Sequence, residues 1–171
     1  MKPVRTLLTA AIAALSLNAH AVTVPTDGSW FEFDFDGAGS SLYDLNTLEK
    51  SFTFNLSQSS ILSVIDLGFS GDRFNISANG VSLGLTSAPV AQETEAIFDI
   101  ATALNDSRFS KGNWNLAAGN YTITGIATDS PYGGGFGSMS VVAVPEPESW
   151  ALLLVGLGIV GTIARRRSLD V

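Results

Sequence analysis

Asp34 and Asp36 are the residues of this chain whose type and spacing most directly indicate chemistry. They stand at alternate positions before Gly37, and hard oxygen ligands in such an arrangement suit calcium. The pattern departs from an EF-hand, because Ala38 and Leu45 stand where further acidic ligands belong. The alternative interpretation is an acidic strand edge followed by a turn, whose charges discourage pairing with another strand.

The same two carboxylates could also serve glycoside hydrolysis, which uses a pair of acids about 5 to 9.5 Å apart. On one face of a strand, the backbones of residues i and i+2 lie about 7 Å apart. A β-domain this small leaves little room for a substrate cleft, however. We therefore expect a protein that is not an enzyme, with calcium as the one candidate cofactor.

The composition excludes several common catalytic and metal centres. The chain has no cysteine, and its single histidine, His20, falls in a segment that we expect to be removed. A Ser-His-Asp triad, a Cys-His pair and a zinc site built on thiolate or imidazole are therefore impossible in the mature protein. Carboxylates, lysine, tyrosine and hydroxyl groups remain available.

Four aromatic residues could offer a platform for sugar rings, whose C–H faces stack on aromatic rings; they are Trp30, Trp114, Tyr121 and Tyr132. Tyr132 falls in the glycine-rich segment 129–137, predicted to be a loop, and is the best candidate for an exposed glycan contact. That loop lacks the lysine of a phosphate-binding loop. The other three residues fall in predicted strands, where aromatic rings more often belong to the core.

Short strands must position these residues. Residues 30–36 alternate strictly between aromatic and acidic side chains, and residues 51–56 alternate in the same way, which predicts strands with one buried face. Residues 61–69 are more continuously apolar, which predicts a central strand. Residues 96–104 fit either a strand or one short helix.

Asn79-Gly80 joins two alternating segments and predicts a β-hairpin with a type I′ turn, because that turn needs a positive φ at both central residues. Five apolar side chains would then share the buried side of the hairpin: Phe74, Ile76, Val81, Leu83 and Leu85. In all, seven to nine short strands with turn signals roughly every ten residues predict an all-β fold, an antiparallel β-sandwich of jelly-roll type.

The β-domain is strongly acidic. Between Val22 and Val144 there are thirteen acidic and four basic side chains, a net charge of −9. Nucleic-acid binding needs a basic patch, so nucleic acid is excluded as a partner. The acidity favours solubility and divalent cations.

Residues 1–21 have the features of a secretory signal peptide: Lys2 and Arg5 precede an apolar stretch, and Ala19-His20-Ala21 forms a cleavage site. The predicted mature chain starts at Val22. Its β-sandwich domain covers residues 22–143, and a third segment covers residues 144–171.

This third segment has three parts. Pro145-Glu146-Pro147 comes first, fifteen uncharged residues follow from Trp150 to Ala164, and Arg165, Arg166 and Arg167 follow those. As a helix the apolar run would be about 22 Å long, short of the roughly 30 Å hydrocarbon core of a bilayer. The arginines favour the cytoplasmic side and would stop translocation.

The order of these parts resembles the PEP-CTERM sorting signal of exported bacterial proteins. The resemblance implies recognition and cleavage near Pro145-Glu146-Pro147 by an exosortase, a membrane-embedded cysteine transpeptidase, in a Gram-negative bacterium. The stretches GFSGDRFNISANGVSLGLTS and DSRFSKGNWNLAAGNYTITGIA are similar to β-rich ectodomains attached to such tails. The resemblance implies a β-rich fold for this domain, and it implies no catalytic residues.

Two functions follow as hypotheses. The first is a structural or interaction protein, held transiently in the inner membrane as a transmembrane helix and then delivered to the cell surface or an exopolysaccharide matrix. The second is a β-sandwich module that binds carbohydrate or calcium.

Overall fold

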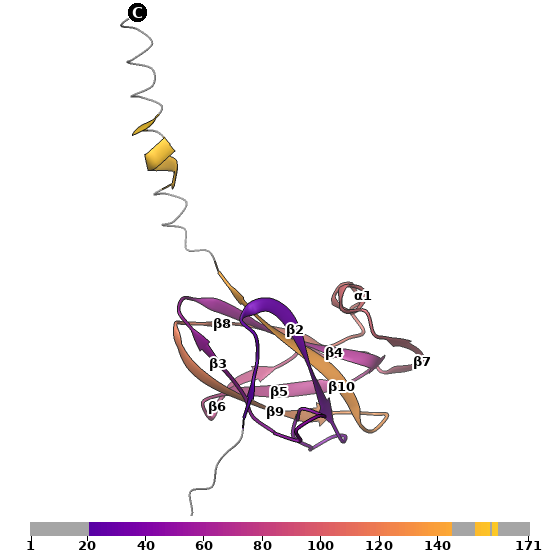
Figure 1. The fold of residues 1–171 in the computed structure, drawn as a ribbon. Coiled ribbons are helices and arrows are strands. Elements are labelled where there is room, and N and C mark those ends of the chain that lie inside the picture. Colours follow the sequence, from indigo (N-terminus) through magenta and orange to yellow (C-terminus); the bar gives the residue numbers. More distant parts are fainter. Residues whose placement is uncertain (1–20, 145–152, 158, 161–171) are drawn as a thin grey trace, which may run out of the picture.

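The structure, a computed structural model, describes residues 21–144, 153–157, 159 and 160. Residues 21–144 fold into two β-sheets (Figure 1). One sheet consists, in order, of β1 (Val22–Thr23), β3 (Phe52–Leu56), β9 (Gly119–Asp129), β5 (Arg73–Ala78) and β6 (Val81–Leu85). The other consists of β2 (Asp27–Phe35), β10 (Gly135–Ala143), β4 (Ser60–Ser70) and β7 (Gln92–Ile97), and β8 (Lys111–Leu116) also pairs with β4.

The strand pairs are antiparallel, except that β1 and β3 run parallel. The all-β sandwich expected from the sequence is therefore confirmed, with ten strands and one short helix within residues 21–144. From β2 to β5, successive strands alternate between the two sheets, and the jelly-roll type stays a prediction.

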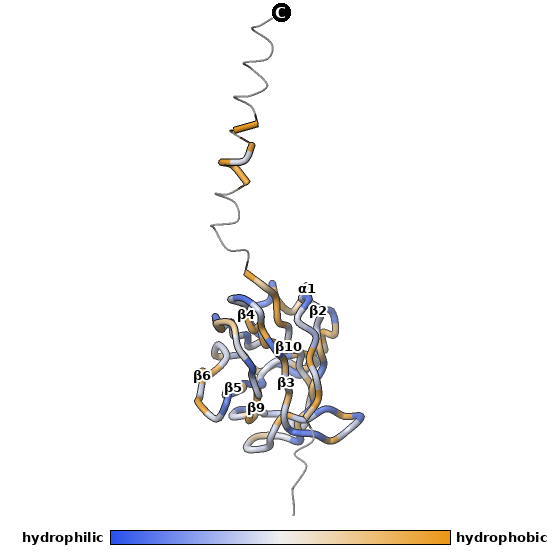
Figure 2. Tube along the Cα trace, turned by 60° about the vertical axis from the view of Figure 1, so that its left-hand side comes forward, coloured by the Kyte–Doolittle hydropathy of each residue, from blue (hydrophilic) through white to orange (hydrophobic). Residues whose placement is uncertain are grey.

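Side chains from the facing sides of the two sheets make the main core. The alternating segment in β2 buries Phe33 and Phe35, and β5 buries Phe74 opposite them. The rings of Phe33 and Phe74 meet edge to face with centroids 5.3 Å apart, a favoured aromatic geometry. In Figure 2, hydrophobic residues follow β10 over much of its length.

The second sheet is also covered on its outer face. A smaller buried cluster there consists of Ile65, Leu67, Ile97, Ala103 and Phe109. Ala103 belongs to α1 (Ile100–Asn105), which Asp99 caps by accepting a 2.8 Å hydrogen bond from the backbone N–H of Thr102. Because both faces of β4 are covered, its residues are buried almost continuously, which confirms the predicted central strand.

The predicted hairpin is confirmed, with β5 and β6 joined by Asn79 at φ 50° and Gly80 at φ 78°. The predicted burial of β6 is wrong for two residues, since Val81 is 68% and Leu85 46% exposed. The strand lies at the sheet edge, and a register shift between Ile76 and Ser77 places Gly84 opposite Ile76. The inward alternation of β5 is therefore not continued in β6.

Two further boundaries differ from the sequence expectation. The ambiguous segment 96–104 is divided between β7, which ends at Ile97, and α1. The glycine-rich segment 129–137 is only partly a loop, because β10 begins at Gly135 and pairs with β2 and β4 from there. Backbone pairing on both sides holds these glycines in the sheet.

The C-terminal apolar segment is described at residues 153–157, 159 and 160, which are helical, exposed and largely hydrophobic (Figure 2). Among the described residues, no helix has both the length and the apolar character needed to cross a membrane. The predicted transmembrane helix therefore has no support from this part of the chain. The rest of that helix and the signal peptide up to His20, including Ala19, lie outside the described residues, whereas Ala21 is described and exposed.

Candidate functional site

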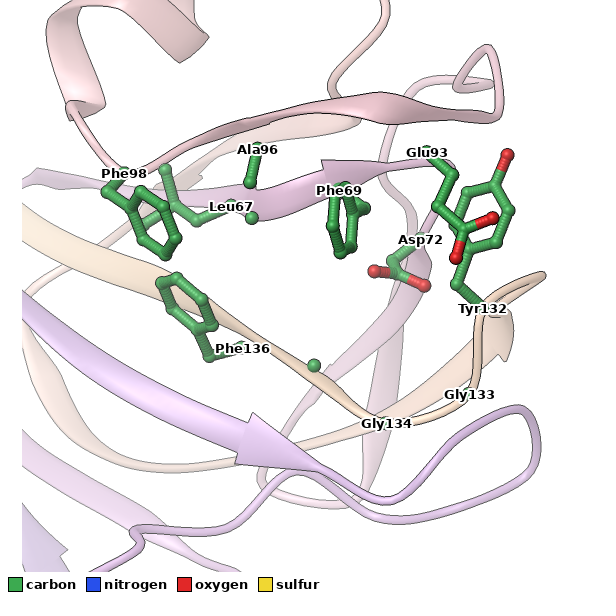
Figure 3. Close-up of a pocket in the computed structure, with 12 residues that line it drawn as sticks. Leu67, Phe69, Asp72, Glu93, Ala96, Phe98, Tyr132, Gly133, Gly134 and Phe136 are labelled. Atoms are coloured by element: carbon green, nitrogen blue, oxygen red, sulfur yellow. The ribbon is translucent and has the colours of Figure 1, made fainter.

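A pocket of about 320 Å³ opens on the outer side of the second sheet, where β4, β7 and the start of β10 come together (Figure 3). The loop that joins β9 to β10 closes one end of it. Its lining is aromatic, acidic and glycine-rich: Leu67, Gly68, Phe69, Asp72, Glu93, Ala96, Phe98, Tyr132, Gly133, Gly134, Gly135 and Phe136.

Two pairs of aromatic rings form most of the pocket wall. Phe98 and Phe136 stack with centroids 5.7 Å apart and an interplanar angle of 13°. Phe69 and Tyr132 meet edge to face at 6.2 Å. In Figure 3 the first pair lies at one end of the pocket, Tyr132 lies at the other, and Phe69 lies between them.

These rings are unusually open to solvent for large aromatic side chains. Phe98 is 69%, Phe69 41% and Tyr132 39% exposed. A group of exposed aromatic side chains around a concavity is typical of a ligand-binding site.

The local backbone allows the rings to lie close to the sheet. Gly68 in β4 has φ 85°, a conformation that glycine adopts easily, and the register between β4 and β7 shifts next to it. A Cβ at position 68 would lie only 3.2 Å from Cε1 of Phe136. The glycine therefore makes room for the Phe136 ring over β4.

Two carboxylates, Asp72 and Glu93, are the charged groups of the pocket. Asp72 is 6% exposed and is backed by Asp66, which is completely buried in β4. Oδ2 of Asp66 accepts hydrogen bonds from the backbone N–H groups of Gly71 at 3.4 Å and Asp72 at 3.3 Å. Oδ1 of Asp66 has no hydrogen-bond partner among the described residues.

Burial shifts the titration of this acid pair. Burial, together with the charge of Asp72, raises the pKa of Asp66 to about 9. Burial also raises the pKa of Asp72 to about 6, although hydrogen bonds with Ser130 and Asp66 act in the opposite direction. At neutral pH the pair therefore keeps a proton on Asp66 and a negative charge on Asp72, the member that lines the pocket.

The structure places one of the predicted glycan-contact residues in this pocket. Tyr132 is exposed and lies in the β9–β10 loop, as predicted. Trp114 and Tyr121 are half-buried against the main core, and Trp30 packs on the smaller outer cluster. These three rings belong to the packing of the domain, which agrees with the alternative interpretation of them.

The predicted acidic pair of β2 lies elsewhere. Asp34 pairs through its backbone with Tyr43, and the Tyr43 hydroxyl donates a 2.9 Å hydrogen bond to Oδ1 of Asp36. Partial burial, then the charges of Glu32, Asp44 and Asp36, raise the pKa of Asp34. Within the described part of the chain, no three His, Cys, Asp or Glu side chains are grouped to hold a metal, and calcium at Asp34 and Asp36 stays a prediction.

Sequence reasoning missed most of the pocket. Asp66 carried a signal, since an acid in the middle of the most apolar run of the chain demands a special environment. Glu93 and Phe98 carried none, because their position depends on the irregular pairing of β7 with β4.

The residues predicted to direct sorting and stop translocation, Pro145 to Pro147 and Arg165 to Arg167, lie outside the described residues. Their assignment receives separate support, because residues 143–168 match the family model of the PEP-CTERM protein-sorting motif. The chain carries a PEP-CTERM sorting signal. That signal indicates an exported protein which an exosortase recognises and processes at the membrane, as the sequence predicted.

Solved structures offer only distant likenesses to the chain. The pre-peptidase C-terminal domain of collagenase from Bacillus anthracis is 13% identical, with a TM-score of 0.42 over 71% of this chain and 94% of that one. A CBM6 of LamC, a marine laminarinase from Zobellia galactanivorans, is 13% identical, with a TM-score of 0.36 over 66% and 98%. A β-1,3-glucan-binding CBM6 from Bacillus halodurans is 16% identical, with a TM-score of 0.35 over 65% and 74%.

Likenesses this weak carry no argument about a ligand. No curated protein sequence matches the chain. The function of the β-sandwich must therefore be argued from its own pocket.

Proposed function

We propose that this protein is an exported carbohydrate-binding module, which its PEP-CTERM signal delivers to the cell surface or to an exopolysaccharide matrix. The single observation that carries the binding function is the aromatic pocket on the second sheet, with Phe69, Phe98 and Tyr132 open to solvent. The sequence favoured a structural or interaction role first and carbohydrate binding second. The pocket supports the second of these hypotheses.

The chemistry of the pocket supports a sugar as ligand. A pyranose ring has apolar C–H faces and a polar rim, so it needs aromatic surface beside hydrogen-bond acceptors. The pocket provides both, with stacked and edge-to-face ring pairs next to the carboxylates of Asp72 and Glu93.

We further propose that the module binds without turnover. Hydrolysis needs two carboxyl groups that act separately, on opposite sides of one glycosidic bond. In this pocket, Asp66 is completely buried behind Asp72 and does not line the cavity. Asp72 and Glu93 both line it, but a pocket of about 320 Å³ leaves little room for the two sugar rings on either side of a scissile bond, which suits binding better than catalysis.

The proposal is tested by titrating the full chain with a panel of oligosaccharides in a detergent that has no sugar head group. Replacement of both Phe98 and Tyr132 by alanine should abolish the binding of any saccharide that the native chain binds. Val81→Ala is the matched control, since Val81 is an equally open apolar residue far from the pocket lining. Unchanged affinity in the double variant would show that the pocket is not the site, and release of shorter sugars would show an enzyme.

A further inference from the structure

The pocket has a charge that the proposed function does not yet explain. Its two ionisable acids, Asp72 and Glu93, face the cavity, and none of the basic side chains in residues 21–144 lines it. Arg108 instead pairs with Asp106 at 2.5 Å and with Glu95 of β7 at 3.4 Å. The pocket therefore presents uncompensated negative charge to its ligand.

Lys50 is exposed and does not line the pocket, and the other two basic side chains donate hydrogen bonds elsewhere in the domain. Nε of Arg73 donates a 3.0 Å hydrogen bond to the carbonyl oxygen of Thr86. Nζ of Lys111 donates hydrogen bonds to the carbonyl oxygens of Leu104 at 2.5 Å and Asp106 at 3.2 Å. Neither side chain forms an ion pair with Asp72 in the described part of the chain, and no basic group contributes to the shift in the pKa of Asp72.

Asp72 can gain a counter-charge only from the pocket side. Its other neighbours carry no positive charge: Ser130 forms a hydrogen bond with it, and Asp66 is a completely buried acid, one oxygen of which has no hydrogen-bond partner among the described residues. A buried carboxylate with no positive neighbour is costly, and a cation brought by a ligand would relieve that cost.

The aromatic rings favour the same kind of ligand. The negative faces of aromatic rings attract a cation within about 6 Å, most strongly when water is excluded. Phe69 and Tyr132 meet edge to face with centroids 6.2 Å apart, and they line the same pocket as Asp72 and Glu93. An ammonium group carried by a sugar ring would meet aromatic faces and a carboxylate together.

We infer that the pocket selects amino sugars whose amine is free, so that an ammonium group pairs with Asp72 and Glu93 while the sugar ring covers Phe69 and Tyr132. This inference rests on the proposed carbohydrate-binding function and narrows it to one class of saccharide. Neutral sugars and N-acetylated amino sugars lack the cation, and uronic acids bring a repelling charge.

Titration calorimetry of the full chain at pH 7 tests the selection with three oligomers of equal length: glucosamine, N-acetylglucosamine and glucose. Glucosamine oligomers should bind at least about ten-fold more tightly than the other two, since a charge-assisted contact is gained. Glu93→Gln and Asp72→Asn should each remove most of this preference. Glu32→Gln is the matched control, because it removes the same charge from an exposed position in the same sheet but outside the pocket lining.

The possible outcomes test the selection of amino sugars separately from the proposed carbohydrate-binding function. Equal affinity for the three oligomers would overturn the selection and leave carbohydrate binding intact, whereas no binding of any saccharide would overturn both. Tight binding of a lysine-rich peptide in place of amino sugars would also overturn the inference. If Asp72→Asn does not fold, Glu93→Gln still decides, since Glu93 is exposed.

Discussion

The backbone N–H of Asp72 donates a 3.3 Å hydrogen bond to Oδ2 of Asp66, and this contact holds two carboxyl groups against one another behind the aromatic pocket. Gly71, at φ 136°, makes the turn that brings them together, and a Cβ there would lie 2.8 Å from Cγ of Pro131. The acid pair is thus built into the connection between β4 and β5, and it links the stability of the domain to the charge of its pocket.

Asp66→Asn should flatten the pH dependence of stability. The folded state raises the pKa of Asp66 to about 9, so the folded domain holds a proton that the unfolded chain releases above about pH 4. This contribution is complete below about pH 4 and is lost as the pH rises toward 9. In a domain of this size, each kcal/mol corresponds to roughly 2–8 °C in Tm.

The measurement is Tm from pH 4 to 9 for the native chain and the variant. The amide of the variant is neutral at every pH and can still donate to Asp72, so its advantage should grow toward alkaline pH. Asp129→Asn, an exposed acid at the end of β9, is the control and should leave the native profile unchanged. Parallel profiles for Asp66→Asn and the native chain would contradict the assignment of the proton.

Binding of amino sugars should weaken on acidification. Burial raises the pKa of Asp72 to about 6, so acidification from pH 7 to pH 5 protonates this group, which then cannot pair with an ammonium ion. We expect about a ten-fold loss of affinity between pH 7 and pH 5 in a titration. N-acetylated oligomers, measured alongside, should show no comparable loss, and an equal loss for both ligands would point to a change in the fold.

The sequence predicted those features of the domain that depend on local patterns. Alternation marked β2 and β3, the apolar run marked β4, and Asn79-Gly80 marked the hairpin turn, because each reflects interactions between residues close in the chain. The pocket depends instead on contacts between distant segments, and its residues, Asp72 and Phe98 among them, have no common pattern. Tyr132 was identified because a tyrosine in a glycine-rich loop is exposed whatever the topology.

Gly125→Ala should destabilise the domain by about 1–3 kcal/mol, the usual cost of overpacking a core. The sequence marked this glycine only as an interruption of the alternation in β9. In the structure, a Cβ there would lie 2.5 Å from Cδ1 of Leu42 and 3.0 Å from Cδ1 of Ile76, both fully buried. Denaturant unfolding measures the loss; the neighbouring exposed position serves as control, since Thr124→Ala adds nothing to the core.

Asp34→Asn should raise Tm at neutral pH in the absence of metal. Partial burial and the charges of Glu32, Asp44 and Asp36 raise the pKa of Asp34, which means that its charge is unfavourable where it stands. If the predicted calcium site exists, added calcium will raise the Tm of the native chain and will have no effect on the variant with both Asp34 and Asp36 changed to asparagine. A calcium response that survives in the double variant would place any calcium site elsewhere.

Replacement of Arg165, Arg166 and Arg167 by glutamine should impair processing of the chain at its sorting signal. A cluster of arginines after a short apolar helix favours the cytoplasmic side, and without it the tail can slip through the membrane or invert. Mass spectrometry of both termini, from membrane and medium, should find a native product that starts at Val22 and ends between Glu146 and Glu148. The variant should lose this product, whereas a Ser168→Ala control should keep it.

An intact Val171 in every fraction of the native protein would mean that the segment serves as a plain anchor. An unchanged product from the triple variant would mean that the arginines do not stop translocation.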